Sequence, residues 1–168
     1  MENNLGQFKL PRWGELPTID LYLEQVLWLI DEWLGAYMSD GKKPVMTKTM
    51  VNNYVKQKFI APPVNKKYDT LAVASLFVIA ILKSVYTMHE ISKLILLAIN
   101  FNDHENAYNQ FCQMTENAVE EAFSCRTMIK KEDSNDPRYI LWNACSSFAC
   151  QLYVKKTFLQ IENIENIS

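Results

Sequence analysis

Residues 46–68 read MTKTMVNNYVKQKFIAPPVNKKY, and their first half has the spacing of an amphipathic helix. The apolar face of that helix holds four side chains, Met50, Val51, Tyr54 and Val55. The opposite face is polar and carries Lys48, Thr49, Asn52, Asn53 and Lys56. Thr47 is a good N-cap residue, and Met46 and Val51 stand at the N′ and N4 positions of a hydrophobic staple. The pattern predicts a helix over residues 47–58 that buries one face and exposes the other.

A basic wing is expected after this helix. Pro62 and Pro63 end regular structure and hold the chain extended, so residues 61–68 form a short arm that carries Lys66 and Lys67. The segment 41–68 contains seven of the chain's seventeen basic residues and none of its nineteen acidic residues. The net charge of −2 for the whole chain therefore conceals a basic patch of +7. Such a patch is the electrostatic footprint of a surface that meets phosphates.

The polar face of the predicted helix has the side chains that proteins use to read DNA. Asparagine makes paired hydrogen bonds to adenine, and lysine reaches guanine edges or phosphates. We expect Lys56 to contact a phosphate. The loop that contains Lys42 and Lys43 is expected either to contact a phosphate or to be merely solvated. A solvated polar face on an ordinary helix is the alternative interpretation of residues 47–58.

Three segments of this region carry a resemblance to a known family: residues 47–54, 59–63 and 67–69. They resemble the winged helix-turn-helix of mercury-resistance-regulator (MerR-type) proteins. In that family a Thr-initiated recognition helix with a Tyr near its end leads through a Pro-Pro step into a basic wing. The resemblance implies phosphate contacts for Tyr54, Lys66 and Lys67. It also implies that four side chains face the bases, namely Lys48, Thr49, Asn52 and Asn53.

The MerR-type resemblance extends over about residues 47–99, and Lys58 stands where that family usually has a helix-ending glycine. The chain as a whole resembles more closely a bacterial family known as domain of unknown function 1836, which is itself considered MerR-like. Both resemblances imply the same fold and the same binding class, with double-stranded DNA as the partner.

The rest of the sequence predicts an all-α fold with at most a small hairpin at the wing, because glycine is rare and no long Val/Ile/Thr alternation occurs. Thr18 is expected to cap a long first helix whose buried stripe is Ile19, Leu23, Val26, Ile30, Trp33 and Tyr37. Residues 71–82 predict a central buried helix, because this apolar run falls well short of the ~20 residues that cross a membrane. A capping box formed by Thr87 and Glu90 predicts the next helix, whose inward side chains are Ile91, Leu94, Ile95 and Ala98.

Two longer helices are expected in residues 101–168. The first carries a seam of Tyr108, Phe111, Thr115, Ala118, Ala122, Cys125 and Ile129. The second begins at Asp136 and Pro137 and presents Leu141, Cys145, Phe148, Leu152 and Leu159 on one face. We predict an antiparallel hairpin joined by residues 130–135, which either completes the core of one chain or supplies a dimer contact. Residues 1–100 then form a DNA-binding lobe, and residues 101–168 form an assembly or sensing lobe.

No sequence motif for catalysis, a metal or a cofactor is recognisable. The four cysteines, Cys112, Cys125, Cys145 and Cys150, lack metal-ligand spacing and are expected to be buried thiols. A pocket for an effector is a further hypothesis, with Tyr139, Trp142, Phe148 and Tyr153 as its lining. Ordinary packing of these aromatic side chains is the alternative. The sequence shows no charged residue clearly turned inward that would orient a ligand. The first residues lack the features of a signal peptide, so the cytoplasm is the expected location.

These features predict a cytoplasmic, homodimeric, sequence-specific DNA-binding transcriptional regulator without a cofactor, and not an enzyme. The alternative is a helical protein-interaction module whose basic patch docks an acidic partner.

Overall fold

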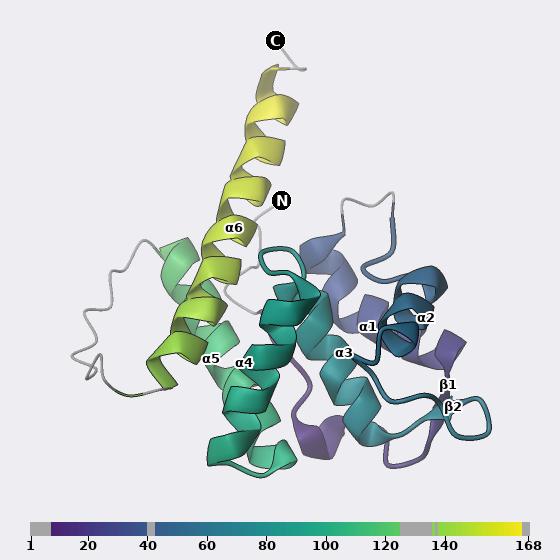
Figure 1. Cartoon of the computed structure of the whole chain (residues 1–168). Coiled ribbons are helices and arrows are strands. Elements are labelled where there is room, and N and C mark those ends of the chain that lie inside the picture. The colour runs from purple at the N-terminus through teal and green to yellow at the C-terminus, as the bar shows by residue number, and fades with distance from the viewer. Residues whose placement is uncertain (1–7, 40–42, 125–135, 137, 166–168) are drawn as a thin grey trace.

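The computed structural model describes residues 8–39, 43–124, 136 and 138–165, with side chains as far as residue 159. These residues form six α-helices, a short 3-10 helix and a two-stranded sheet (Figure 1), so the predicted helical fold is confirmed. The elements in chain order are η2 (Trp13–Glu15), β1 (Leu21–Tyr22), α1 (Leu23–Met38), α2 (Lys48–Lys56), β2 (Lys67–Tyr68), α3 (Thr70–Leu82), α4 (Met88–Phe101), α5 (His104–Ser124) and α6 (Arg138–Glu165).

Helix α3 occupies the middle of the molecule and contacts α1, α4, α5 and α6 (Figure 1). It is buried on nearly every side, and Leu76, Phe77 and Ile81 are fully buried. Asp69 caps its N-terminus, because the carboxylate accepts a hydrogen bond from the backbone N–H of Ala72 at 2.8 Å. The predicted central buried helix is confirmed, and its uniform apolarity follows from the helices that surround it.

The start of α1 differs from the sequence prediction. Helix α1 begins at Leu23 with Tyr22 as its N-cap, so Thr18 does not cap it. Leu21–Tyr22 instead forms β1, which pairs antiparallel with β2. Ile19, predicted to be buried, is 72% exposed. The helical spacing of these residues is overridden by pairing with a strand more than forty residues later, a contact that local periodicity does not reveal.

The capping box at the start of α4 is confirmed. The hydroxyl of Thr87 accepts a hydrogen bond from the backbone N–H of Glu90, and the Glu90 carboxylate accepts one from the N–H of Thr87 at 2.8 Å. Hydrogen bonds from the Thr87 backbone and side chain lower the pKa of Glu90. Ile91 is fully buried, as predicted. Three further side chains are partly buried along the same helix, Leu94, Ile95 and Ala98.

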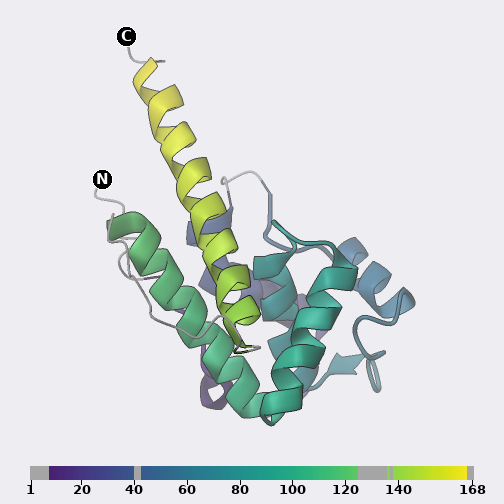
Figure 2. The same ribbon diagram turned by 60° about the vertical axis from the view of Figure 1, so that its left-hand side comes forward.

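Helices α5 and α6 pack side by side, but they run parallel (Figure 2). The Thr115 hydroxyl donates to the Sγ of Cys145 at 3.4 Å, and two turns further along the rings of Phe123 and Tyr153 lie 5.3 Å apart. Both contacts join positions that are 30 residues apart in sequence, as a parallel pair requires and an antiparallel pair forbids. The predicted antiparallel hairpin is therefore wrong.

The connection between α5 and α6 is long enough to let the two helices run parallel. Helix α5 has 21 residues and is ~30 Å long at 1.5 Å per residue. The chain from Ser124 to Arg138 spans more than 40 Å when extended at ~3.4 Å per residue, so it is long enough to return along the whole of α5. The predicted connection over residues 130–135 was short enough to favour a hairpin.

The predicted seam on α5 packs within the chain. Tyr108, Thr115 and Ala118 are buried, and Phe111 and Ala122 pack against the core as partly buried side chains. Cys125 and Ile129 lie outside the described residues. Of the two roles proposed for the seam, the described part serves the core.

Helix α6 projects beyond the rest of the molecule at its C-terminal end (Figures 1 and 2). Near its start, the Asp136 carboxylate accepts a hydrogen bond from the backbone N–H of Arg138 at 2.9 Å, while Pro137 lies outside the described residues. Cys145, Phe148 and Leu152 are buried as predicted. Leu159 is 42% exposed, contrary to the prediction, because the core does not extend to the projecting turns.

One hydrophobic cluster runs through both predicted lobes. Phe8, from the N-terminal segment, places its ring 4.9 Å from that of Tyr37 on α1 and 6.2 Å from that of Phe148 on α6. The clustered residues extend from Phe8 to Leu152, so the predicted boundary near residue 100 does not coincide with a break in the core.

Two expectations about side chains and membranes can be checked in the described residues. Cys112 and Cys145 are buried thiols, as expected, whereas Cys150 is exposed on the outer face of α6 and Cys125 lies outside the described residues. No helix in this part of the chain combines the length and apolarity needed to cross a bilayer.

Candidate nucleic-acid interface

Helix α2 presents the predicted polar face to solvent. The Thr47 hydroxyl caps the helix by accepting a hydrogen bond from the backbone N–H of Met50 at 3.3 Å. Val51 is fully buried against the core, which fixes the rotation of the helix about its axis. The polar residues are all exposed: Lys48, Thr49, Asn52, Asn53 and Lys56. The four predicted base-contacting side chains therefore lie together on one accessible helix, which runs from Lys48 to Lys56.

Tyr54 belongs to the buried side of α2. Only 9% of the residue is exposed, and burial raises the pKa of its hydroxyl. The main role of the ring is therefore to anchor the helix. The phosphate contact implied for Tyr54 by the family resemblance stays a prediction.

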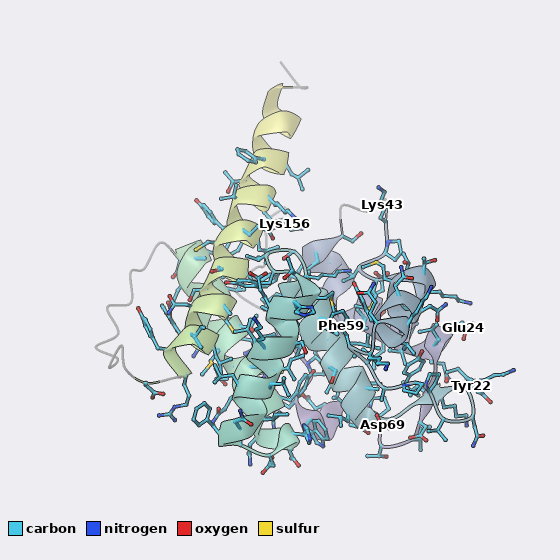
Figure 3. All side chains as sticks on the ribbon, in the orientation of Figure 1. Tyr22, Glu24, Lys43, Phe59, Asp69 and Lys156 are labelled. Carbon is cyan, nitrogen blue, oxygen red and sulfur yellow. The ribbon has the colours of Figure 1, made fainter. Side chains whose placement is uncertain are left out.

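Lys48 has a partner that the sequence did not reveal. Its Nζ lies 2.5 Å from the Oε1 of Glu24 on α1, and the two side chains are 58% and 64% exposed. The hydrogen bond from Lys48 lowers the pKa of Glu24. Figure 3 labels Glu24 and Tyr22 on the side of the molecule that carries α2 and the wing. Glu24 on α1 therefore places a negative charge beside residues 41–68, a segment that contains no acidic residue of its own.

The C-terminal end of α2 is closed by a Schellman motif. The backbone N–H of Lys58 donates to the carbonyl of Val55 at 3.0 Å, and that of Phe59 donates to the carbonyl of Tyr54 at 2.9 Å. Lys58 has a φ of 64°, in the left-handed region that favours glycine. Phe59 then packs edge-on against the ring of His89 on α4 at 5.9 Å. These contacts fix the direction in which the chain leaves α2.

The wing is a tight hairpin. Val64 and Lys67 exchange two backbone hydrogen bonds, of 3.0 and 2.9 Å, around a two-residue turn. The turn residues Asn65 and Lys66 have φ values of 50° and 65°, as a type I′ turn requires. Beyond the turn, β2 pairs with β1, and the Nζ of Lys67 lies 5.0 Å from the ring centre of Tyr22. Lys66 is exposed, Lys67 is partly buried, and the wing projects from the same side of the molecule as α2 (Figures 1 and 2).

The turn that leads into α2 is held from two sides. The backbone N–H of Val45 donates to the carboxylate of Asp31 on α1 at 3.1 Å. The Nζ of Lys83, at the C-terminal end of α3, donates to the carbonyl of Val45 at 2.6 Å. Burial lowers the pKa of Lys83 to about 8. Lys43 is exposed nearby, whereas Lys42 lies outside the described residues.

A buried carboxylate on α5 anchors the N-terminal segment. Glu116 is 5% exposed and accepts hydrogen bonds from both terminal nitrogens of Arg12 at 2.8 Å, from the backbone N–H of Leu10 at 2.9 Å and from Lys9 at 3.3 Å. Burial alone pushes the pKa of Glu116 upward, but these bonds outweigh it and leave the pKa lowered. The sequence prediction missed this inward charge. Its spacing from Cys112 and Val119, both fully buried, was the available signal.

The aromatic residues proposed for an effector pocket do not gather around a common space. Tyr139 stacks on Trp142, Phe148 faces Phe8, and Tyr153 meets Phe123. None of the four lines the cavity that lies between α3, α4, α5 and α6. Within the part of the chain that the structure describes, no group of His, Cys, Asp and Glu side chains has the arrangement of a metal site.

Comparison with known proteins identifies a family. The model of the family described as a domain of unknown function (DUF1836) matches residues 11–114, well over half of the chain. The matched region includes η2, β1, α1, α2, the wing, α3, α4 and the first half of α5. No curated protein and no solved structure matches the chain. The chain belongs to the family described as domain of unknown function DUF1836.

Proposed function

We propose that the protein is a sequence-specific, DNA-binding transcriptional regulator of the winged helix-turn-helix type. The observation that carries this proposal is the combination of α2, with its exposed Lys48, Thr49, Asn52 and Asn53, and a lysine-bearing wing on the same side of the molecule. An α-helix fits the major groove, where asparagine and lysine distinguish base edges. Wing lysines beside such a helix meet the phosphate backbone. The MerR-type resemblance supports the same assignment.

Backbone strain in this region is further support. The described non-glycine residues with positive φ are Lys58, Asn65 and Lys66, and all three lie at the end of α2 or in the wing. Glycine would adopt these conformations at a lower cost in free energy. Such conformations persist where the surrounding structure holds them, and they are enriched at functional sites. Two lysines kept in left-handed conformations agree with a role in phosphate contact.

We propose that the active form is a homodimer, because helix-turn-helix proteins commonly bind paired half-sites. The described seam of α5 is used within the chain, so we assign pairing to the C-terminal part of α6. Its exposed apolar side chains include Val154, Phe158 and Leu159. Sedimentation at micromolar concentration is expected to show about twice the chain mass of 19.5 kDa. A single species at the chain mass would rule out this arrangement.

The first experiment is selection of genomic DNA fragments by the purified chain, with enrichment of one palindromic sequence as the expected result. Anisotropy titrations against that sequence and a scrambled duplex, at one salt concentration, then compare two α2 variants. Asn52→Ala is expected to cost ~1–3 kcal/mol on the selected sequence and to leave scrambled DNA unaffected. Lys56→Ala is expected to weaken both duplexes similarly. Parallel losses for Asn52→Ala, or no loss, would refute base reading by α2.

The alternative function is a protein-interaction module whose basic patch docks an acidic partner. The ion pair between Lys48 and Glu24 favours this candidate, because it shows that the face of α2 accommodates a carboxylate. The selection experiment separates the two functions. An interaction module enriches no DNA sequence, and its weak binding to DNA responds to salt without distinguishing the selected duplex from the scrambled one.

A further inference from the structure

The ion pair between Glu24 and Lys48 stands at the N-terminal end of α2. Glu24 is in the first turn of α1, and Lys48 is the first residue of α2. The Nζ of Lys48 lies 2.5 Å from the Oε1 of Glu24, and both side chains are more than half exposed. Val26 on α1 and Val51 on α2 are fully buried, which fixes the face that each helix turns to solvent. A hydrogen-bond donor and an acceptor from two helices are therefore held side by side, on the side of the molecule that carries α2 and the wing (Figure 3).

This pair has hydrogen-bonding capacity beyond the bond within it. An ammonium group carries three donors, and the bond to Glu24 uses one of them. The hydrogen bond from Lys48 lowers the pKa of Glu24, so the carboxylate is ionised at neutral pH and only accepts hydrogen bonds. Because the two charges cancel, the pair as a whole gains little from attraction to phosphates. What it offers to DNA is a donor and an acceptor in a fixed order.

A G·C base pair presents the complementary order in the major groove. Guanine shows two acceptors, N7 and O6, and the N4 amino group of cytosine lies beside them as a donor. A hydrogen bond of ~2.9 Å joins O6 to N4, a spacing similar to the 2.5 Å between the Nζ of Lys48 and the Oε1 of Glu24. Lys48 can donate to O6 and N7 while Glu24 accepts the outward hydrogen of N4.

The other base pairs match this order less well. A C·G pair turns the N4 donor toward the ammonium and the O6 acceptor toward the carboxylate, so both contacts become repulsive. An A·T pair in either orientation brings an acceptor, adenine N7 or thymine O4, close to the carboxylate. The pair formed by Glu24 and Lys48 therefore distinguishes G·C from the other three arrangements.

We propose that Glu24 and Lys48 together read one G·C base pair, with guanine facing Lys48 and cytosine facing Glu24. This inference rests on the proposed function and adds to it a base-reading residue from α1. Lys48 and Asn52 are one turn apart on α2, ~6 Å at 1.5 Å per residue. Successive base pairs are ~3.4 Å apart, so the G·C pair lies within about two steps of the base pair that Asn52 is proposed to read.

Anisotropy titrations against a series of duplexes test the inference. The series starts from the sequence selected from genomic DNA and places each of the four base-pair arrangements in turn at every position of one half-site. For the unmodified chain, one position is expected to favour G·C over C·G by about tenfold or more. Glu24→Ala and Lys48→Ala are each expected to reduce that ratio severalfold at this position and to leave the ratios at other positions unchanged. Glu24→Gln, which keeps an acceptor oxygen, is expected to retain part of the preference.

Glu32→Ala is the matched control, because Glu32 is an exposed acid about two turns further along α1. Removal of either acid is expected to raise the affinity for every duplex, since it removes a negative charge. The ratio between duplexes is therefore the deciding quantity, and only Glu24→Ala is expected to change it. The same ratios in Glu24→Ala as in Glu32→Ala would show that Glu24 contacts no base and would overturn the inference.

Exchange of the two charges gives a second, independent result. The double variant Glu24→Lys with Lys48→Glu places the acceptor where the donor stood, so it is expected to prefer C·G over G·C at the same position. A preference for G·C that survives the exchange, or the absence of any preference while circular dichroism shows an intact fold, would refute the reading by this pair. Enrichment of no DNA sequence would remove the proposed function and the inference together. Enrichment of a sequence whose positions are all insensitive to Glu24→Ala would remove the inference alone.

Discussion

The Nζ of Lys83 donates a hydrogen bond to the carbonyl oxygen of Val45 at 2.6 Å, and this contact ties the end of the central helix α3 to the turn before α2. Met50 is also within reach of the same nitrogen, with its sulfur at 3.8 Å. The ammonium therefore stands between an apolar side chain and a single carbonyl, and the pKa of Lys83 falls to about 8 because of burial.

The depressed pKa of Lys83 predicts a pH dependence of stability. An exposed lysine has a pKa of 10.5, so between pH 8 and 10.5 the unfolded chain binds more protons at this site than the folded chain. The free energy of unfolding is therefore expected to gain a contribution from Lys83 as the pH rises through this window. Lys83→Met is expected to remove that contribution, whereas Lys93→Met, at an exposed position on α4, keeps it. Urea unfolding between pH 8 and 10.5 measures how the free energy of unfolding changes with pH. The same change with pH in both variants would contradict the assignment to Lys83.

The ion pair between Glu24 and Lys48 predicts a gain of DNA affinity on removal of the acid. Glu24→Gln frees Lys48 and removes a negative charge beside α2, so DNA affinity is expected to rise a few-fold at low salt. The gain is expected to shrink as salt screens the charge. Thermal unfolding is expected to change little, because exposed ion pairs stabilise proteins weakly. Glu120→Gln makes the same charge change on α5 and is the control; if both variants gain equally, net charge alone explains the effect.

The left-handed conformation of Lys58 predicts a stabilising substitution. Lys58→Gly is expected to raise the free energy of unfolding by ~0.5–1 kcal/mol, because glycine adopts this φ at less cost. Lys56→Gly is the matched control within the helix and is expected to lower it by ~1 kcal/mol. Urea unfolding of both variants measures the difference. Destabilisation by Lys58→Gly would show that the lysine side chain contributes more than its backbone conformation costs.

Substitutions of Lys66 in the wing turn are expected to affect the stability of the chain and its binding to DNA in different ways. Lys66→Gly suits the type I′ turn and is expected to stabilise the chain by ~0.5–1 kcal/mol. The same change removes a predicted phosphate contact, so the slope of log affinity against log salt is expected to fall by ~0.9. Lys66→Ala is expected to reduce the slope of log affinity against log salt by the same amount, but not to raise the free energy of unfolding. If neither variant alters binding to arbitrary duplexes, the wing tip is not part of the contact surface.

The buried carboxylate of Glu116 predicts destabilisation when its charge is removed. Glu116→Gln leaves Arg12 without its ionic partner and is expected to lower the free energy of unfolding by ~3 kcal/mol at pH 7. Because hydrogen bonds hold the pKa of Glu116 below its ordinary value of 4.5, its contribution is present above pH 4.5 and is lost as the pH falls through the lowered pKa. The difference between the unmodified chain and Glu116→Gln should therefore narrow in acid. Glu120→Gln, one turn along the helix, is expected to change stability little.

Features that depend on neighbouring residues were predictable from the sequence. The Thr47 and Thr87 caps, the buried face of α2 and the apolar α3 each follow from a few adjacent positions, and each is confirmed. The predicted base-contacting residues do share one exposed helix, although their contact with DNA stays a prediction.

Features that depend on distant residues were not predictable in this way. Helical spacing in Ile19 and Leu23 gave no sign that Leu21 pairs with Tyr68. The apolar stripes of α5 and α6 are the same for either direction of packing, so the parallel arrangement could be inferred only from the connection between them. The bonds from Lys83 to Val45 and from Arg12 to Glu116 join positions that are 38 and 104 residues apart. In each of these bonds, one partner looks like an ordinary surface charge when the sequence is read alone.

The position of Glu116 also bears on where this domain can be cut. The family match ends at residue 114, two residues before the carboxylate that binds Arg12, Leu10 and Lys9. A fragment trimmed to residues 11–114 would leave the Arg12 guanidinium without the Glu116 carboxylate. It would also expose the sides of α3, α4 and α5 that pack against α6. The segment that the family model matches is therefore shorter than the packed core of this chain, and a fragment of it made for expression should extend through α6 rather than stop at residue 114.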